Sequence, residues 1–157
     1  LDRLAEAGAR VINLSLAGPP NTALEETVAR LVGDGIVVVA AAGNGGPRAG
    51  AAYPAAYDGV IAVSAVDGNG NVYRRAQQGD HVDLSAPGVD VWTAASISGA
   101  RTKTGTSFAA PFVTAAAALV LQRQPDLTPA GVEAALVASA LDLGDPGRDP
   151  VHGAGLV

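Results

Sequence analysis

The sequence contains no cysteine, which excludes disulfide bridges, zinc thiolate sites and cysteine nucleophiles together. The sequence has 10 lysine and arginine residues against 15 acidic residues, which gives a net charge of −5. It therefore has no excess of basic residues that could bind the phosphate backbone of a nucleic acid. No apolar run reaches the roughly 18 residues that a membrane-spanning helix needs. We therefore expect no thiol chemistry, no nucleic acid partner and no membrane span.

The residues that are present favour one folded unit. The 157 residues are 48% hydrophobic and 16% charged, a balance that argues against disorder. A chain of about 150 residues buries roughly two-thirds of its surface on folding, which is enough for a real core. Because the sequence has no repeat and no low-complexity linker, we predict a single unit over residues 1–157. The chain does not begin with methionine, and we expect it to be part of a longer protein.

The hydrophobic pattern predicts alternating helices and strands. Helical spacing covers residues 2–8, 23–32, 107–122 and 129–141, and strand patterns cover residues 10–16, 36–42, 60–66, 82–84 and 89–92. Either Asn21 or Thr22 caps the second helix, and Thr128 caps the last one with Pro129 in its first position. Residues 36–42 are apolar throughout, as in parallel strands covered on both faces. We predict a three-layer α/β fold with a mostly parallel sheet and helices on both faces.

A serine at the start of a predicted helix is the first candidate for chemistry. Gly105 and Thr106 precede Ser107, which begins the helix over residues 107–122. The unpaired amides and the positive dipole end of a helix N-terminus favour developing negative charge, which suits a nucleophile. An isolated serine in this position is more often an ordinary N-cap, so its neighbours must decide.

Asn44 is the second candidate, because it follows the apolar strand over residues 36–42. Open parallel sheets place their sites at the carboxyl ends of the strands. The side-chain amide of Asn44 could donate to an oxyanion there. Alone, an asparagine between Gly43 and Gly45 is more often a turn residue.

Six motifs in a fixed order resemble the second half of a subtilisin-like serine protease, or subtilase. They occupy residues 11–16, 37–44, 53–54, 60–63, 84–88 and 105–107, and the resemblance runs over nearly the whole chain. It implies that the chain is an incomplete half of a subtilisin-like α/β domain.

The resemblance also implies roles for individual residues. Ser107 would be the acyl-forming nucleophile of a serine endopeptidase, with the Ser107 amide and the Asn44 side chain as the oxyanion hole. An extended polypeptide substrate would bind along an edge and a first specificity pocket formed by Ser15, Leu16, Ala17, Gly18, Ala42, Gly43 and Ala52. Because this lining is small and uncharged, we expect an apolar or aromatic substrate side chain in the pocket.

The family requires no cofactor, but it has a weak site for calcium or a monovalent cation. In this sequence that site would involve Ala55, Tyr57 and Val60, with Asp67 nearby. The resemblance further implies a secreted or cell-envelope location.

The chain contains no evident base for Ser107. A serine hydroxyl needs a positioned base, usually a histidine oriented by a carboxylate. His81 and His152 are the only histidines, and both fall where the resemblance places no catalytic group. In the subtilisin chain order the aspartate and histidine precede the serine, so we expect both upstream of Leu1 and expect the isolated chain to be inactive.

The missing half would also leave the strand at residues 11–16 without one neighbour. Unpaired apolar edges recruit other chains. We therefore expect the isolated chain to dimerise, swap a strand or aggregate unless its upstream half is supplied.

Three places depart from the family pattern. Ala17 stands where glycine is frequent, and its methyl group narrows the substrate edge. Phe108 and Phe112 replace a frequent methionine and histidine, and we interpret both as packing residues. Residues 74–79 replace an aromatic and serine pair, and the sequence assigns them no role.

Alternative interpretations stay open at this point. An α/β-hydrolase could use Ser107, Asp142 or Asp145, and His152, although Ala109 stands where its motif needs glycine. A pseudoprotease or protease-derived binding module would keep the substrate edge without the base. Residues 43–46 faintly resemble a dinucleotide loop, and residues 67–71 resemble the opening of a calcium loop, for which a β-turn is the better interpretation.

Overall fold

Four parallel strands form the main sheet of the protein, which we describe from a computed structural model over residues 1–94 and 99–157. The strands lie in chain order across the sheet, β1-β2-β3-β4. Their bounds are Val11–Leu14 for β1, Val37–Ala41 for β2, Val60–Val66 for β3 and Leu84–Pro87 for β4. In the register, Val39 of β2 lies opposite Asn13 of β1 and Ile61 of β3.

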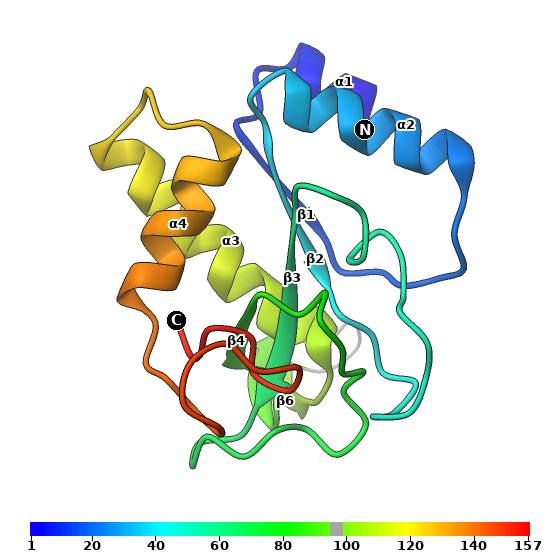
Figure 1. Ribbon diagram of the computed structural model, residues 1–157, viewed down its shortest axis with the longest axis vertical. Coiled ribbons are helices and arrows are strands. Elements are labelled where there is room, and N and C mark those ends of the chain that lie inside the picture. The colour runs from blue at the N-terminus through cyan, green and yellow to red at the C-terminus, as the bar shows by residue number, and fades with distance from the viewer. Residues whose placement is uncertain (95–98) are drawn as a thin grey trace.

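Helices cover both faces of this sheet (Figure 1). On one face, α3 (Thr106–Arg123) contacts all four strands and packs against α4 (Pro129–Ser139). On the other face, α2 (Thr22–Gly33) packs against β2, and the short α1 (Asp2–Glu6) precedes β1. The predicted three-layer α/β architecture is therefore confirmed. In the described part of the chain, no helix is both long and apolar enough to cross a membrane.

Alternate side chains of β2 enter two separate cores. Val37, Val39 and Ala41 pack in the core under α3 and α4, whereas Val38 and Ala40 pack in the core under α2. Successive side chains of a strand point to opposite faces, so every position of a strand covered on both sides is buried. The uninterrupted apolar sequence of β2 follows from this arrangement.

The predicted helix caps are present. The Asn21 side chain accepts a hydrogen bond from Leu24 N at 2.9 Å, so Asn21 rather than Thr22 caps α2. Thr128 Oγ1 accepts from Gly131 N at 3.2 Å and caps α4, in which Pro129 is the first residue.

Two strands differ from the prediction. The strand predicted at residues 82–84 begins at Leu84 and continues through Pro87, which is tolerated as the last residue of a strand at the side of the sheet. The strand predicted at residues 89–92 is β5 (Val91–Ala94), and it pairs antiparallel with β6 (Ala100–Lys103) in a separate two-stranded sheet. The sequence did not indicate β6, because its residues are polar, exposed and without apolar alternation.

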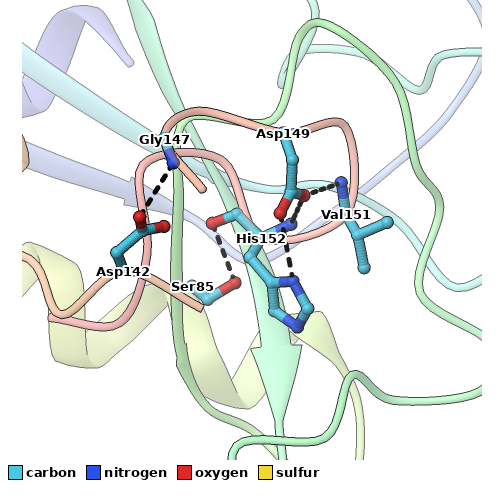
Figure 2. Close-up of polar contacts among 6 residues, drawn as sticks. All are labelled: Ser85, Asp142, Gly147, Asp149, Val151 and His152. Carbon is cyan, nitrogen blue, oxygen red and sulfur yellow. Dashed lines mark hydrogen bonds and ion pairs between the residues drawn. The ribbon is translucent and has the colours of Figure 1, made fainter. Parts of the chain in front are cut away.

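The C-terminal segment lies along β4 and covers its outer edge. Ser85 N donates to Gly155 O at 2.8 Å, and Val157 N donates to Ser85 O at 3.0 Å. Figure 2 shows the Ser85 hydroxyl donating to the His152 carbonyl, at 3.1 Å. Gly153 has a φ of +64°, and a Cβ there would collide with the backbone of Asp83. The segment therefore packs directly against the residues that begin β4.

The opposite side of the sheet is open. Among the described residues β1 pairs only with β2, so its other edge carries no strand. This confirms the unpaired edge predicted for residues 11–16.

Asp149 fixes the turn at the start of the C-terminal segment (Figure 2). Its Oδ1 accepts hydrogen bonds from Val151 N at 2.7 Å and His152 N at 2.8 Å, and its Oδ2 lies 3.6 Å from His152 Nδ1. Burial alone would raise the pKa of Asp149, but the two amides and the imidazole lower it below its ordinary value.

We expect Asp149→Asn to lower the free energy of unfolding at neutral pH. The difference from wild type should shrink as the pH falls. A carboxyl group whose pKa is lower in the folded state contributes stability above its unfolded pKa of about 3.9, and loses this contribution as the pH falls through the folded value. Urea denaturation from about pH 3 to about pH 7 measures this difference. Asp145→Asn, at an exposed position nearby, is the control, and a difference for Asp149→Asn that is constant with pH would contradict the assignment.

Candidate active site at the carboxyl ends of the strands

Ser107 lies in the first turn of α3. This helix begins at the end of the molecule where the parallel strands finish (Figure 1). The chain enters the helix through Gly105, whose φ of +152° is rare for residues with a Cβ. Gly105 N donates to Gly88 O at 2.8 Å, which fixes this turn beside the end of β4. The Ser107 amide is among the first four of the helix, which have no acceptor within the helix itself.

The carbonyl of Ser107 is bonded outside the helix. Pro111 lies four residues later and has no N–H to donate to it. Instead, Ser15 Oγ donates to Ser107 O at 2.8 Å from the end of β1. Asn13 Nδ2 donates to Ser15 Oγ at 2.8 Å, and Thr114 Oγ1 donates to Asn13 Oδ1 at 3.0 Å. These hydrogen bonds connect the end of β1 to the first three turns of α3.

The side chain of Asn44 is oriented by Thr106. Asn44 Oδ1 accepts hydrogen bonds from Thr106 N at 3.0 Å and from Thr106 Oγ1 at 3.2 Å. Because the oxygen of the carboxamide is occupied, its Nδ2 group is the one available to donate to another acceptor. The Thr106 hydroxyl also accepts from Gly43 N at 3.2 Å, and Thr106 is buried. The structure therefore brings Asn44 to the residue that directly precedes Ser107.

Gln77 holds the loop that follows β2. Gln77 N donates to Gly43 O at 3.0 Å, its Oε1 accepts from Gly45 N at 3.2 Å, and its Nε2 donates to Gly50 O. A Cβ on Gly43 would collide with the Gln77 side chain, and the φ of Gly43 is +109°. Sequence reasoning missed Gln77, because a glutamine in the polar run at residues 74–79 carries no sign that it is buried.

The residues predicted to bind substrate surround this loop. Gly18 and Tyr53 form an antiparallel bridge, with hydrogen bonds of 2.9 Å and 3.0 Å, which brings residues 15–18 next to Ala52. Ala52 is buried, and its Cβ lies 3.2 Å from the place of a Cβ on Gly43. Ala42 is buried directly after β2, whereas Leu16 and Ala17 are exposed. The Gly18–Tyr53 bridge and the closeness of Ala52 to Gly43 thus join the predicted edge residues to the predicted pocket residues.

Asp67 does not join the other residues predicted for a cation site. Its Oδ1 accepts from Asn69 N at 2.8 Å and Asn71 N at 3.0 Å, and the Asn71 side chain also donates to it. The Asn71 side chain, followed by the two amides, lowers the pKa of Asp67. Gly70 N donates to Asp67 O at 3.1 Å, which makes the β-turn that was the better interpretation of residues 67–71.

The other three predicted cation residues lie together around a different cavity. This cavity has a volume of about 190 Å³, and its lining includes Ala55, Tyr57, Val60, His81, Asp83 and Glu133. Asp67 lines a separate cavity of about 530 Å³. The expectation that Asp67 belongs with Ala55, Tyr57 and Val60 was therefore wrong, because its carboxylate serves its own turn.

The two histidines lie apart from the candidate site formed around Ser107 and Asn44. His152 stands beside Asp149, with its carbonyl bonded to Ser85 (Figure 2). His81 lines the 190 Å³ cavity, where burial lowers its pKa. Asp142 accepts from Gly147 N at 2.8 Å and belongs to the loop before Asp149. The contacts of His152 and Asp142 thus give no support to the α/β-hydrolase alternative.

Comparison with known proteins identifies the family. The model of the subtilase family matches residues 1–155. Subtilisin DY of Bacillus licheniformis is 44% identical over 142 residues, which are 88% of this chain and 52% of that protein. Subtilisin Savinase of Lederbergia lenta is 40% identical over 151 residues, which are 96% of this chain and 55% of that protein. The structure of the prenylagaramide maturation protease PagA gives a TM-score of 0.87 at 30% identity, covering 99% of this chain and 62% of that one.

The fold and the sequence together define a subtilisin-like α/β protein, and the chain belongs to the subtilase family. The resemblance seen in the sequence motifs is confirmed. The chain spans about half the length of the curated relatives it matches, at 52% of subtilisin DY and 55% of subtilisin Savinase.

We expect Thr106→Val to destabilise the protein by about 1–3 kcal/mol, the usual cost of leaving a buried polar group without its partner. Valine preserves the shape but removes the acceptor of the buried Gly43 N–H and one donor to Asn44. Chemical denaturation measures the loss. Thr27→Val is the matched control, because the Thr27 hydroxyl only donates to Ala23 O within α2. Equal effects of the two substitutions would contradict the role given to Thr106.

Proposed function

We propose that the protein to which this chain belongs is a serine endopeptidase that cleaves peptide bonds through an acyl-enzyme on Ser107. The observation that carries this proposal is the contact between the Asn44 carboxamide and Thr106, directly before a serine in the first turn of α3. Family membership supports the same activity. An active site of this kind needs a nucleophile and donors for the oxyanion, and both are supported by this geometry.

In the proposed reaction, Ser107 Oγ attacks the carbonyl carbon of the scissile peptide bond and gives its proton to a base. The carbonyl oxygen becomes an oxyanion, which accepts hydrogen bonds from the Ser107 amide and from Asn44 Nδ2. The intermediate expels the amine, which takes the proton from the base, and leaves an ester on Ser107. Water then hydrolyses the ester and regenerates the hydroxyl.

The base and its carboxylate are proposed to come from residues that precede this chain in the parent protein. The serine is last in the subtilisin order of aspartate, histidine and serine. Both histidines of this chain lie elsewhere, His152 beside Asp149 and His81 at the cavity that Asp83 also lines. We therefore propose that the isolated chain is inactive. The alternative of a binding module without catalysis is the outcome if no upstream base exists.

The substrate is proposed to be an extended polypeptide that lies along residues 15–18 and places an apolar side chain near Ala52. The small uncharged residues Ala42, Gly43 and Ala52 support this preference. No cofactor takes part in the proposed reaction. A secreted or cell-envelope location is also proposed, on the family relationship alone.

The upstream half of the domain is the proposed partner of the open edge of β1. Leu16 just after β1 is 51% exposed and Phe112 on α3 is 46% exposed, so apolar surface lies on both elements that meet at Ser107. Unpaired strand edges with apolar neighbours favour association.

In the full-length protease, we expect Ser107→Ala to abolish acyl-enzyme formation and Asn44→Leu to lower kcat by about 10²–10³, a loss known from subtilisin itself. KM should change little for Asn44→Leu, because the oxyanion contact forms in the transition state. Steady-state kinetics on a peptide substrate and labelling with a serine-directed phosphonate provide the measurements. Ser139→Ala, at an exposed position of α4, is the control. Phosphonate labelling that persists in Ser107→Ala would refute the assignment of the nucleophile.

The isolated chain should self-associate, and its upstream half, expressed separately and added in equal amount, should replace this association with a one-to-one complex. Light scattering measures both states. Leu119→Ser removes an exposed leucine of α3 without changing the edge of β1, and it should leave the self-association unchanged. A monodisperse monomer of the isolated chain would count against the role of the edge.

A further inference from the structure

The cavity lined by Ala55, Tyr57 and Val60 is where the family relationship leads one to expect a cation, and the residues around it do not fit one. Calcium takes six to eight oxygen ligands. Asp83 is the most buried carboxylate at this cavity, with a side chain only 10% exposed, and both of its oxygens are already bonded. Its Oδ2 accepts from Ala62 N at 2.7 Å, and its Oδ1 accepts from Arg148 Nη2 at 2.6 Å.

The other side chains around the cavity add little to a cation site, and one of the two lone pairs of Tyr57 O is already used, because this oxygen accepts from Val60 N at 3.2 Å. Asp58 is exposed to solvent, and His81 offers ring nitrogens, which calcium and sodium do not favour. Over residues 1–94 and 99–157, no three histidine or acidic side chains gather closely enough to hold a metal ion.

We propose that the guanidinium group of Arg148 takes the place of a metal ion here and serves as a built-in counter-ion of the cavity. It contacts Asp83 Oδ1, and the same Nη2 lies 3.1 Å from Asp80 O, a backbone oxygen of the segment before β4. One cationic side chain thus meets a carboxylate and a carbonyl, which are the two kinds of oxygen ligand that a hard cation would use. A metal ion placed beside it would be repelled by the fixed positive charge.

The charge of Arg148 also reaches a second acidic residue of the cavity. Glu133 of α4 is half-buried, and burial together with the charge of Asp83 raises the pKa of Glu133. Arg148 acts in the opposite direction on the same carboxyl group. Its positive charge therefore offsets Asp83, just before β4, and Glu133 of α4, as a bound cation would.

The loop that carries Arg148 is braced on both sides, as Figure 2 shows. Before Arg148, Gly147 N donates to Asp142 Oδ2 at 2.8 Å. After it, Asp149 Oδ1 accepts from the amides of Val151 and His152. Further hydrogen bonds join the segments themselves, from Gly79 N to Pro150 O at 2.9 Å and from Ala154 N to Asp83 O at 2.8 Å. The backbone on both sides of Arg148 is thus fixed by the fold, while its side chain is 48% exposed and reaches Asp83 from the solvent side.

The test is thermal unfolding of the full-length protein in sodium chloride, calcium chloride and choline chloride at equal ionic strength. The Tm of wild type and that of Asp83→Asn should respond equally to the three salts. Neither protein is expected to bind a cation at this cavity, so any response arises at another site. Arg148→Gln should gain a rise in Tm of about 2–4 °C or more with sodium or calcium over choline, as expected for a ligand that binds the folded state. Adding Asp83→Asn to Arg148→Gln should remove this gain. Arg148→Lys keeps the charge and should gain no response.

Two results would overturn the proposal. One is a cation response of wild type that Asp83→Asn abolishes, and the other is Arg148→Gln without any gained response. If Arg148→Gln does not fold in choline, its refolding yield replaces Tm as the readout. Refolding restored by sodium or calcium supports the proposal, and failure in every salt refutes it. Since the readout is stability, the result does not depend on the proposed catalytic activity.

Discussion

The structure of the candidate site depends on one contact, the pair of hydrogen bonds from Thr106 to Asn44 Oδ1. Asn44 follows β2 and Thr106 begins α3, so this contact joins the middle of the sheet to the helix that crosses it. It also sets which end of the Asn44 carboxamide faces outward, and the Thr106 hydroxyl supports the loop through Gly43 N. The relative placement of serine and asparagine therefore follows from a buried threonine rather than from either residue alone.

Much of the fold could be predicted from the sequence, because its signals are local. The unbroken apolar run of β2 indicates a strand covered on both faces, and Asn21 and Thr128 cap their helices where the pattern places them. β6 was missed because a short polar strand exists only through its pairing with β5. The limits of β4 were misplaced because the neighbouring β3 and the C-terminal segment, not its own sequence, set them.

The candidate site likewise contains residues that local sequence patterns indicate and residues that only the folded structure reveals. Ser107 and Asn44 are indicated by their positions at a helix start and a strand end, which sequence patterns reveal. Gln77 was missed because its contacts join distant segments, and Asp67 was grouped with the cation residues although its contacts are local. Asp67 turned out to bond within its own turn, whereas Asp83 lies with Ala55, Tyr57 and Val60. Arg148 gave no sequence signal at all, since its partner Asp83 is far away along the chain.

Pro111 has a mechanical consequence for Ser107. Because proline cannot bond the Ser107 carbonyl, that carbonyl is held by Ser15, at the end of the strand whose far edge is open. The serine is thus tethered to the margin of the sheet as well as to its helix. A strand added along that margin would steady Ser15 and, through it, the backbone of Ser107. Pairing of the open edge of β1 would in this way also fix the position of Ser107.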